Sequence, residues 1–152
     1  MLVKLEHTCE NTAAQIYTVF QRAYQIEADI IGVNNFPPLF RTQNDITKAK
    51  TVFYALKKQQ HIAALAEITL DTNRLDIHSF VVDPNYFRQG LATQLLNALL
   101  ALPNYTQAFV ETAVKNIPAI NLYEKQGFEI VKQWTPDHGI EKVAMQLNQE
   151  PQ

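Results

Sequence analysis

The chain lacks most of the features that mark stapled, metal-binding or membrane-embedded proteins. Its 152 residues contain one cysteine, Cys9, so no internal disulfide can form, and no spacing of cysteine and histidine resembles a zinc site. No apolar run approaches the ~20 residues needed to span a bilayer, and the first residues lack the apolar segment of a signal peptide. We therefore expect a protein of the reducing cytoplasm, without a bound metal and without a membrane partner.

Charge of one sign is also scarce. Lysine and arginine together number 13, aspartate and glutamate 15, and the formal net charge is −2. Because lysine and arginine do not cluster into a basic surface that could bind a phosphate backbone, a nucleic-acid partner is not expected. The apolar content of 47% is that of a globular protein, and the length suits a single domain covering residues 1–152.

The spacing of apolar residues predicts a mixed α/β architecture. A capping box at 12–15 favours the start of a helix. The helix positions that follow, one of them acidic, are Ile16, Phe20, Ala23 and Glu27. Three alternating runs then predict an antiparallel meander, followed by a strand–helix–strand crossover. In chain order we expect a strand at 3–5, a helix from 12, a loop or short helix at 31–45, strands at 51–56, 61–70 and 75–82, a helix at 90–102, a strand at 108–113, a helix at 116–127, and strands at 128–134 and 141–147.

The junction between the strand at 75–82 and the helix at 90–102 suits a phosphate group. Residues 81–92 read V-V-D-P-N-Y-F-R-Q-G-L-A. Unpaired amides at a helix N-terminus carry partial positive charge, Gly90 lacks a Cβ that would hinder close approach, and Arg88 can add a charge-assisted hydrogen bond. A single glycine is a weak signal by itself, so an ordinary strand-to-helix turn fits these residues equally well.

A second stretch changes that balance. Residues 116–128 read N-I-P-A-I-N-L-Y-E-K-Q-G-F, a capped helix that ends in Gly-Phe. With V-D-P at 82–84 and G-L-A at 90–92, this stretch resembles the GNAT superfamily of N-acetyltransferases, in order and in spacing. The motifs cover 81–134, and the order of elements extends the resemblance over nearly the whole chain.

The resemblance implies a fold and a co-substrate. The fold is a mixed α+β one, with a central, mostly antiparallel sheet, helices on both faces and a parallel strand pair that splays apart. The co-substrate is acetyl-CoA, and its pantetheine arm would run between the strands at 75–82 and 108–113. The residues implied in cofactor binding are Phe80, Val81, Val82, Arg88, Gln89, Gly90, Leu91, Ala92, Thr93, Asn116 and Tyr123.

One residue departs from the family pattern. The phosphate motif begins with glutamine or arginine, whereas this chain has Phe87 there, followed by Arg88 and Gln89. Losing one charge-assisted hydrogen bond costs about 1.5–3 kcal/mol, while the amides of the loop remain. The departure predicts weaker cofactor binding rather than none.

The resemblance implies direct attack by a neutral amine in a ternary complex, with no acyl-enzyme, and Cys9 lies far from both motifs. Tyr123 matches the family tyrosine that protonates the leaving thiolate, although it could instead be a core residue. Asn116 could bind the cofactor or simply cap its helix. We select Glu67 as the catalytic base, and three other strand residues stay open as alternatives: Asp76, His78 and Glu111.

The loop at 31–45 is unusual in its large side chains. Phe36, Phe40 and Arg41 predict either a wall of the acceptor site or a lid packed on the core. The expected acceptor is the amine of a small molecule or peptide, and the protein could act alone or as a homodimer. One other function stays open, an acyl-CoA-binding sensor of the same fold without catalysis. An unrelated mononucleotide-binding α/β domain is disfavoured by the helix at 116–128, which such a fold has no reason to contain.

Overall fold

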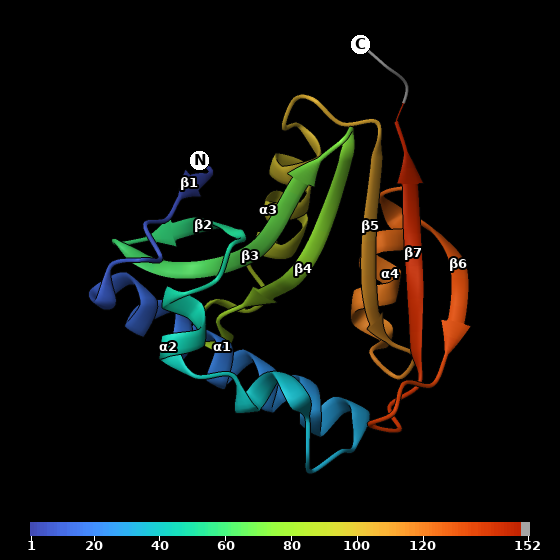
Figure 1. Ribbon diagram of the computed structural model, residues 1–152, viewed down its shortest axis with the longest axis horizontal. Helices are drawn as coiled ribbons and strands as arrows, with labels where there is room; N and C mark the ends of the chain where they lie inside the picture. The colour runs from blue at the N-terminus through green and yellow to red at the C-terminus, as the bar shows by residue number, and fades with distance from the viewer. Residues whose placement is uncertain (150–152) are drawn as a thin grey trace.

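A computed structural model describes residues 1–149, in which seven strands form one twisted sheet in the order β1-β2-β3-β4-β5-β7-β6 (Figure 1). The strands are β1 (Val3–Lys4), β2 (Val52–Lys58), β3 (His61–Asp71), β4 (Arg74–Val82), β5 (Gln107–Ala113), β6 (Glu129–Trp134) and β7 (Lys142–Asn148). The helices are α1 (Glu10–Ile31), α2 (Gln43–Thr47), α3 (Leu91–Leu100) and α4 (Ile117–Lys125), with 3₁₀ helices at Pro37–Phe40 and Pro84–Tyr86. Neighbouring strands are antiparallel except for the parallel pair β4 and β5, which confirms the predicted fold class.

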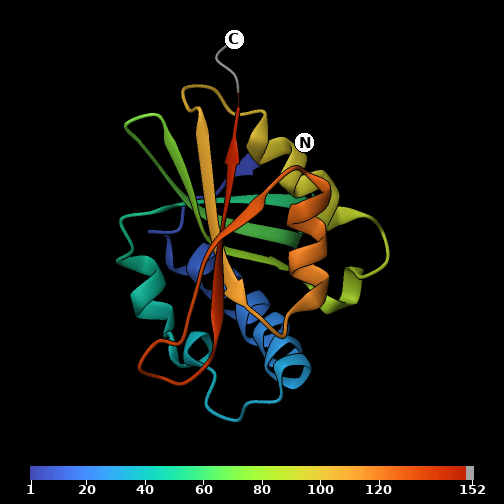
Figure 2. The same ribbon diagram turned by 90° about the vertical axis from the view of Figure 1, so that its right-hand side faces the viewer.

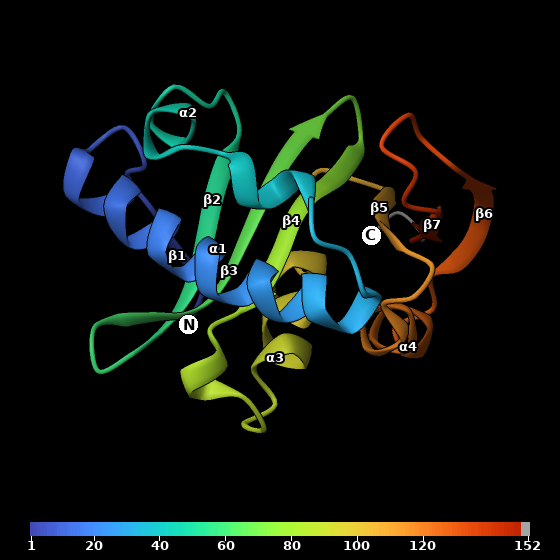
Figure 3. The same cartoon turned by 90° about the horizontal axis from the view of Figure 1, so that it is seen from below.

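The sheet is covered on both faces, which gives two clusters of buried residues. On one face α1 and α2 pack their apolar sides on β2 and β3, where Phe20 contacts Phe53. On the other face α3 and α4 cover the strands (Figures 2 and 3). The leucines of α3 pack into this second cluster, and Leu95 is completely buried. Within residues 1–149, no helix combines the length and apolar character needed to cross a membrane.

The predicted start of the first helix is wrong. α1 begins at Glu10 after Cys9, so the residues expected to form a capping box lie inside the helix. The capping box in this part of the chain is instead formed by Thr42 and Asp45, at the start of α2. There Thr42 Oγ1 accepts from the Asp45 N–H at 3.1 Å, and an Asp45 oxygen accepts from the Thr42 N–H at 2.8 Å. The sequences at 12–15 and 42–45 resemble each other. Ile46, which follows the second of them, is buried and fixes where α2 packs.

The parallel pair β4 and β5 separates partway along its length. The two strands pair over Arg74–Ile77 and Gln107–Val110, and beyond this point each keeps only its outer neighbour. The register of β3 against β4 also shifts next to Glu67, so that His78 is an extra residue in β4. Such a bulge bends a strand and redirects its side chains, which helps the strands to part. The predicted splay is confirmed (Figure 1).

Candidate active site

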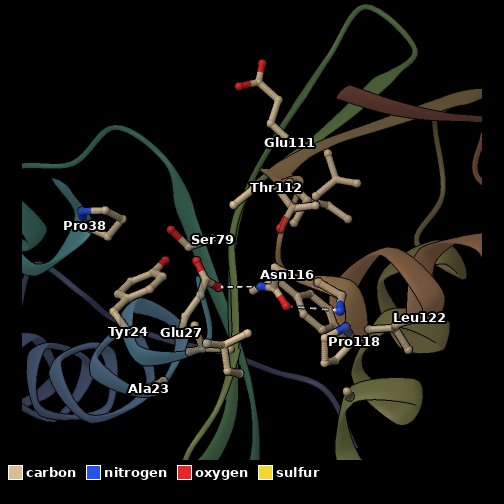
Figure 4. A pocket seen from close by; sticks show the side chains of 18 of the residues that line it. Ala23, Tyr24, Glu27, Pro38, Ser79, Glu111, Thr112, Asn116, Pro118 and Leu122 are labelled. Carbon is tan, nitrogen blue, oxygen red and sulfur yellow. Dashed lines mark hydrogen bonds between the residues drawn. The ribbon is translucent and has the colours of Figure 1, made fainter. Parts of the chain in front are cut away.

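The separation of β4 and β5 opens a cavity of about 810 Å³. It is bounded by the C-terminal half of α1, the segment between α1 and α2, the far ends of β4 and β5, the first turn of α3, one side of α4, and the loop between β6 and β7. Figure 4 shows side chains from α1 and from α4 converging on it from opposite sides of β4. The cavity is therefore reached from three distant parts of the sequence.

Many of the residues that the sequence assigned to binding meet in this cavity. Its lining includes Phe36, Arg41, Phe80, Val81, Val82, Ala92, Thr93, Asn116 and Tyr123. The lining does not include Phe40, Glu67, Arg88, Gln89, Gly90 or Leu91. Residues 88–90 are exposed, whereas Leu91, the first residue of α3, is buried in the core.

The loop that leads into α3 contains two residues in the left-handed backbone conformation. Gly90 is the N-cap of α3 with a φ of 72°, and Arg88 also has a positive φ of 66°. A Cβ at Gly90 would meet no atom within 4 Å, so glycine is favoured here by its backbone conformation and not by crowding. The first amides of α3 have no partner within the helix, and Ala92 and Thr93 line the cavity. Phe87, which replaces the expected polar residue, also lines it.

Tyr123 lies on α4 in the wall of the cavity. Its ring meets Phe80 edge-on at 5.9 Å between centroids and packs on Phe128, and the residue is 3% exposed. No hydrogen bond to its hydroxyl comes from any residue in 1–149, and no fully buried polar side-chain atom there lacks a partner, so the hydroxyl reaches the cavity solvent. Burial, and to a lesser extent the negative charge of Glu27, raises the pKa of Tyr123 far above its usual range. The hydroxyl therefore keeps its proton at neutral pH.

Asn116 has two partners. Its Oδ1 accepts from the Ala119 N–H at 3.3 Å and so caps α4, while its Nδ2 donates to Glu27 Oε1 at 3.0 Å (Figure 4). The residue is 7% exposed. The cap predicted from the sequence is confirmed, and the second bond ties α4 to α1.

Glu67, the residue predicted to be the catalytic base, is enclosed by a polar network. Arg41 Nη1 donates to Glu67 Oε1 at 2.6 Å, and Arg41 Nη2 donates to Glu67 Oε2 at 2.9 Å. The Thr51 hydroxyl also donates to this carboxylate at 2.6 Å, and the Ser79 hydroxyl at 2.9 Å. Burial favours the protonated form, but the bonds from Arg41 and Thr51 outweigh it and hold the pKa of Glu67 below its usual range. A carboxylate so placed is a poor proton acceptor, and Arg41 is likewise committed to this ion pair.

Glu27, which the sequence analysis did not select, lies in the cavity instead. It extends from α1 beside Tyr24, and burial raises its pKa to about 7, against the opposing effects of Asn116 and Lys142. A signal was present in the sequence, because an acidic residue occupied the helical spacing shared with Phe20 and Ala23. An ionisable group on the buried side of a helix is a candidate functional residue.

The other residues considered as bases are more exposed. Glu111 on β5 lines the cavity and pairs with Lys142 at 3.1 Å. His78, the bulge residue, also lines it, and its Nε2 hydrogen-bonds the Thr69 hydroxyl at 2.9 Å. Asp76 pairs with Arg74 and lies outside the cavity lining.

The loop between α1 and α2 contributes unequally. Phe36 is buried, packs edge-on against Tyr24 at 5.9 Å and lines the cavity. Phe40 is 67% exposed and does not form a wall of the cavity. Phe36 therefore contributes to the cavity wall and Phe40 does not, because the 3₁₀ turn at Pro37–Phe40 points successive side chains in different directions.

Comparisons with known proteins agree with this geometry. The model of the acetyltransferase (GNAT) family matches residues 13–128. The UPF0157 protein YqkA of Bacillus subtilis is 29% identical over 130 residues, which are 85% of this chain and 38% of that protein. The chain thus spans less than two fifths of the length of this curated relative.

Solved structures share the fold at low sequence identity. The ribosomal-protein-S18-alanine N-acetyltransferase of Escherichia coli superposes with a TM-score of 0.75 at 22% identity, covering 97% of this chain and 92% of that one. The PaiA N-acetyltransferase of Thermoplasma acidophilum, solved in complex with coenzyme A, has a TM-score of 0.75 at 11% identity, covering 97% and 98%. At these identities the likeness concerns the fold alone.

Proposed function

This chain belongs to the acetyltransferase (GNAT) family, and we propose that it moves an acetyl group from acetyl-CoA to a primary amine of a small molecule or peptide. The observation that carries the proposal is the parting of β4 and β5 inside a cavity that joins the first turn of α3 to Tyr123. A long, thin ligand with an anionic end and a reactive thioester fits such a cavity.

The residues present suit coenzyme A. Its pyrophosphate would accept hydrogen bonds from the free amides of α3, at the positive end of the helix dipole. Its pantetheine arm would bond the main chain of Phe80, Val81 and Val82, since β5 supplies no ladder partner to this part of β4. Phe87 offers an apolar contact where the family has a polar donor, so we expect weaker affinity than in proteins that keep that donor.

Transfer would proceed by direct attack. The lone pair of the neutral amine forms a bond to the thioester carbonyl carbon, and the bond from carbon to sulfur breaks. Main-chain N–H groups of β4 would stabilise the negative charge on the carbonyl oxygen. The Tyr123 hydroxyl would donate its proton to the departing sulfur, while the nitrogen loses the proton that amide formation requires.

A covalent acyl-enzyme has no support. Cys9 is exposed at the start of α1 and lies outside the cavity lining. Hydrogen bonds from the Thr12 and Asn11 amides lower the pKa of Cys9. The residue is remote from the parted strands and would not serve the transfer.

The experiment is to measure release of free CoA from acetyl-CoA with a panel of acceptors, including a peptide with a free N-terminus, a lysine peptide, a polyamine and an aminoglycoside. We expect amine-dependent release with at least one acceptor and the acetylated amine by mass spectrometry. Reactions without amine measure hydrolysis. Tight acetyl-CoA binding with no transfer to any amine would instead favour the non-catalytic sensor.

A further inference from the structure

Among the carboxylates near the parted strands, Glu27 combines access with freedom to accept a proton. Its Oε1 accepts one hydrogen bond from the neutral Asn116 amide, at 3.0 Å. Within residues 1–149 no cation lies within ion-pair distance of it, and its second oxygen has no hydrogen-bond donor. Since no fully buried polar side-chain atom there is unpaired, this second oxygen is accessible to solvent, and Glu27 lines the cavity. Figure 4 shows the carboxylate between Tyr24 and Asn116.

The competing carboxylates are occupied. Glu67 accepts four hydrogen bonds, two of them from a guanidinium, and does not line the cavity. Glu111 lines the cavity but is paired with Lys142, and 53% of its side chain is exposed.

We propose that Glu27 is the proton acceptor of the transfer, removing a proton from the acceptor ammonium inside the cavity between α1 and α4. This inference rests on the proposed acetyl transfer and names a residue that the family resemblance does not supply. The carboxylate would also attract the ammonium into the cavity, so that binding and deprotonation use the same group.

The protons balance with Tyr123 as the partner group. The ammonium gives one proton to Glu27 and becomes a neutral amine, which forms the bond from nitrogen to the carbonyl carbon as the carbon–sulfur bond breaks. Sulfur leaves with the Tyr123 proton, and the second proton lost by nitrogen returns to the tyrosine. The products are the acetamide, CoA as a thiol and protonated Glu27, which releases its proton to solvent.

The electrostatics of the cavity favour this division of roles. The pKa of Glu27, raised to about 7 by burial, lies near neutral pH, where a general base is most effective. Ionised Glu27 in turn raises the pKa of Tyr123, so the base helps to keep the acid protonated. The titratable and charged groups that share the cavity are Tyr24 on α1, Arg41 before α2, His78 on β4, Glu111 on β5, Tyr123 and Lys125 on α4, His138 before β7, and Lys142 on β7.

The test is the pH dependence of kcat/KM for the amine at saturating acetyl-CoA. The wild type should lose activity below pH ~7, with a slope of one in log kcat/KM. Glu27→Gln keeps the shape and can still accept the Asn116 hydrogen bond, but it cannot take a proton. We expect it to lower kcat at pH 7 by ~10²-fold or more and to abolish the limb near pH 7, with the acetyl-CoA Kd unchanged. Glu27→Asp, which keeps a carboxylate, should restore part of the rate and the limb.

Two controls make the outcome decisive. Asp29→Asn removes a charge from the same helix outside the cavity and should leave the profile unchanged. Two acceptors of different amine pKa separate the enzyme limb, which stays fixed, from the limb of the amine, which moves.

Persistence of the fixed limb in Glu27→Gln, or its loss in Glu111→Gln instead, overturns the role of Glu27 and leaves the acetyl transfer standing. A wild type that acetylates no amine overturns both proposals.

Discussion

Asn116 Nδ2 donates a 3.0 Å hydrogen bond to Glu27 Oε1, joining the start of α4 to α1 across a gap of 89 residues in sequence. The same side chain caps α4 through its Oδ1. One residue thus holds the position of the proposed base and begins the helix that carries the proposed acid.

The two bonds of Asn116 can be separated by mutation. Serine at this position can still cap the helix but has no amide to reach Glu27, whereas alanine loses both bonds. We expect Asn116→Ala to destabilise the fold by ~1 kcal/mol through loss of the cap, and Asn116→Ser to cost only a few tenths. Both should raise the pKa of Glu27 and move the acid limb of kcat/KM to higher pH, because the lost bond favours the charged form. Denaturant unfolding and pH–rate profiles measure the two effects.

Glu27 should also affect stability with a definite sign. Its pKa is about 7 in the folded chain against a reference of 4.5, so between these values the unfolded state binds fewer protons and stability falls as pH rises. The ionisation of Glu27 therefore lowers the free energy of unfolding by its full amount above pH ~7, and it has no effect below pH ~4.5. Relative to the wild type, Glu27→Gln should gain on the order of 1–2 kcal/mol between pH 4 and pH 8, a value discounted for partial solvent screening. Urea unfolding at both pH values tests this, and a difference that is constant with pH would contradict the raised pKa.

The ion pair of Arg41 and Glu67 should act on stability rather than on proton transfer. Removing Arg41 leaves the buried charge of Glu67 without its ion-pair partner, which typically costs 3–5 kcal/mol. We therefore expect Arg41→Ala to lower the urea midpoint strongly and Glu67→Gln to lower it less, because the Arg41 side chain is 28% exposed. Any folded Glu67→Gln protein should keep the acid limb of the pH–rate profile. Loss of that limb without a stability change would return the role of base to Glu67.

Local motifs predicted much of the site because their geometry is local. Gly90 and Asn116 each mark a helix start within a few residues. Tyr123 and the splay of β4 from β5 were expected only from the family resemblance, which rests on the motifs at 82–92 and 116–128. Such motifs can be recognised without knowing how distant segments meet.

The remaining parts of the site depend on tertiary contacts. The Arg41–Glu67 pair forms only because the segment before α2 crosses β3, and this contact holds the pKa of the candidate base below its usual range. Glu27 meets Asn116 only because α1 passes beneath the parted strands (Figure 3). Helix ends were equally ambiguous, since the patterns at 12–15 and 42–45 are alike and packing decided between them.

The turn before α3 can be tested by charge alone. The variants Gly90→Asn and Gly90→Asp introduce side chains of similar size, and both asparagine and aspartate tolerate a positive φ better than most residues. Only the aspartate places a negative charge at the helix start where the pyrophosphate is expected. We expect Gly90→Asp to lose acetyl-CoA binding by calorimetry and Gly90→Asn to keep most of it, with circular dichroism unchanged in both. Equal affinities in the two variants would remove the pyrophosphate from this loop.

The role of Tyr123 rests on its hydroxyl, which Tyr123→Phe deletes while keeping the ring contacts with Phe80 and Phe128. A core tyrosine would show little change in either stability or turnover. Because burial raises the pKa of Tyr123, the proton is always present but is costly to give up to a thiolate, whose pKa is about 8.5 by analogy with cysteine. General-acid catalysis contributes ~10²–10⁴-fold at best, so we expect a fall in kcat toward the lower end, at least ~10-fold, with the acetyl-CoA Kd unchanged. No alkaline limb from this residue should appear in the accessible pH range of the wild type. Because product release could mask the chemical step, the rate should be measured in single turnover. A single-turnover rate equal to that of the wild type would assign the tyrosine to packing.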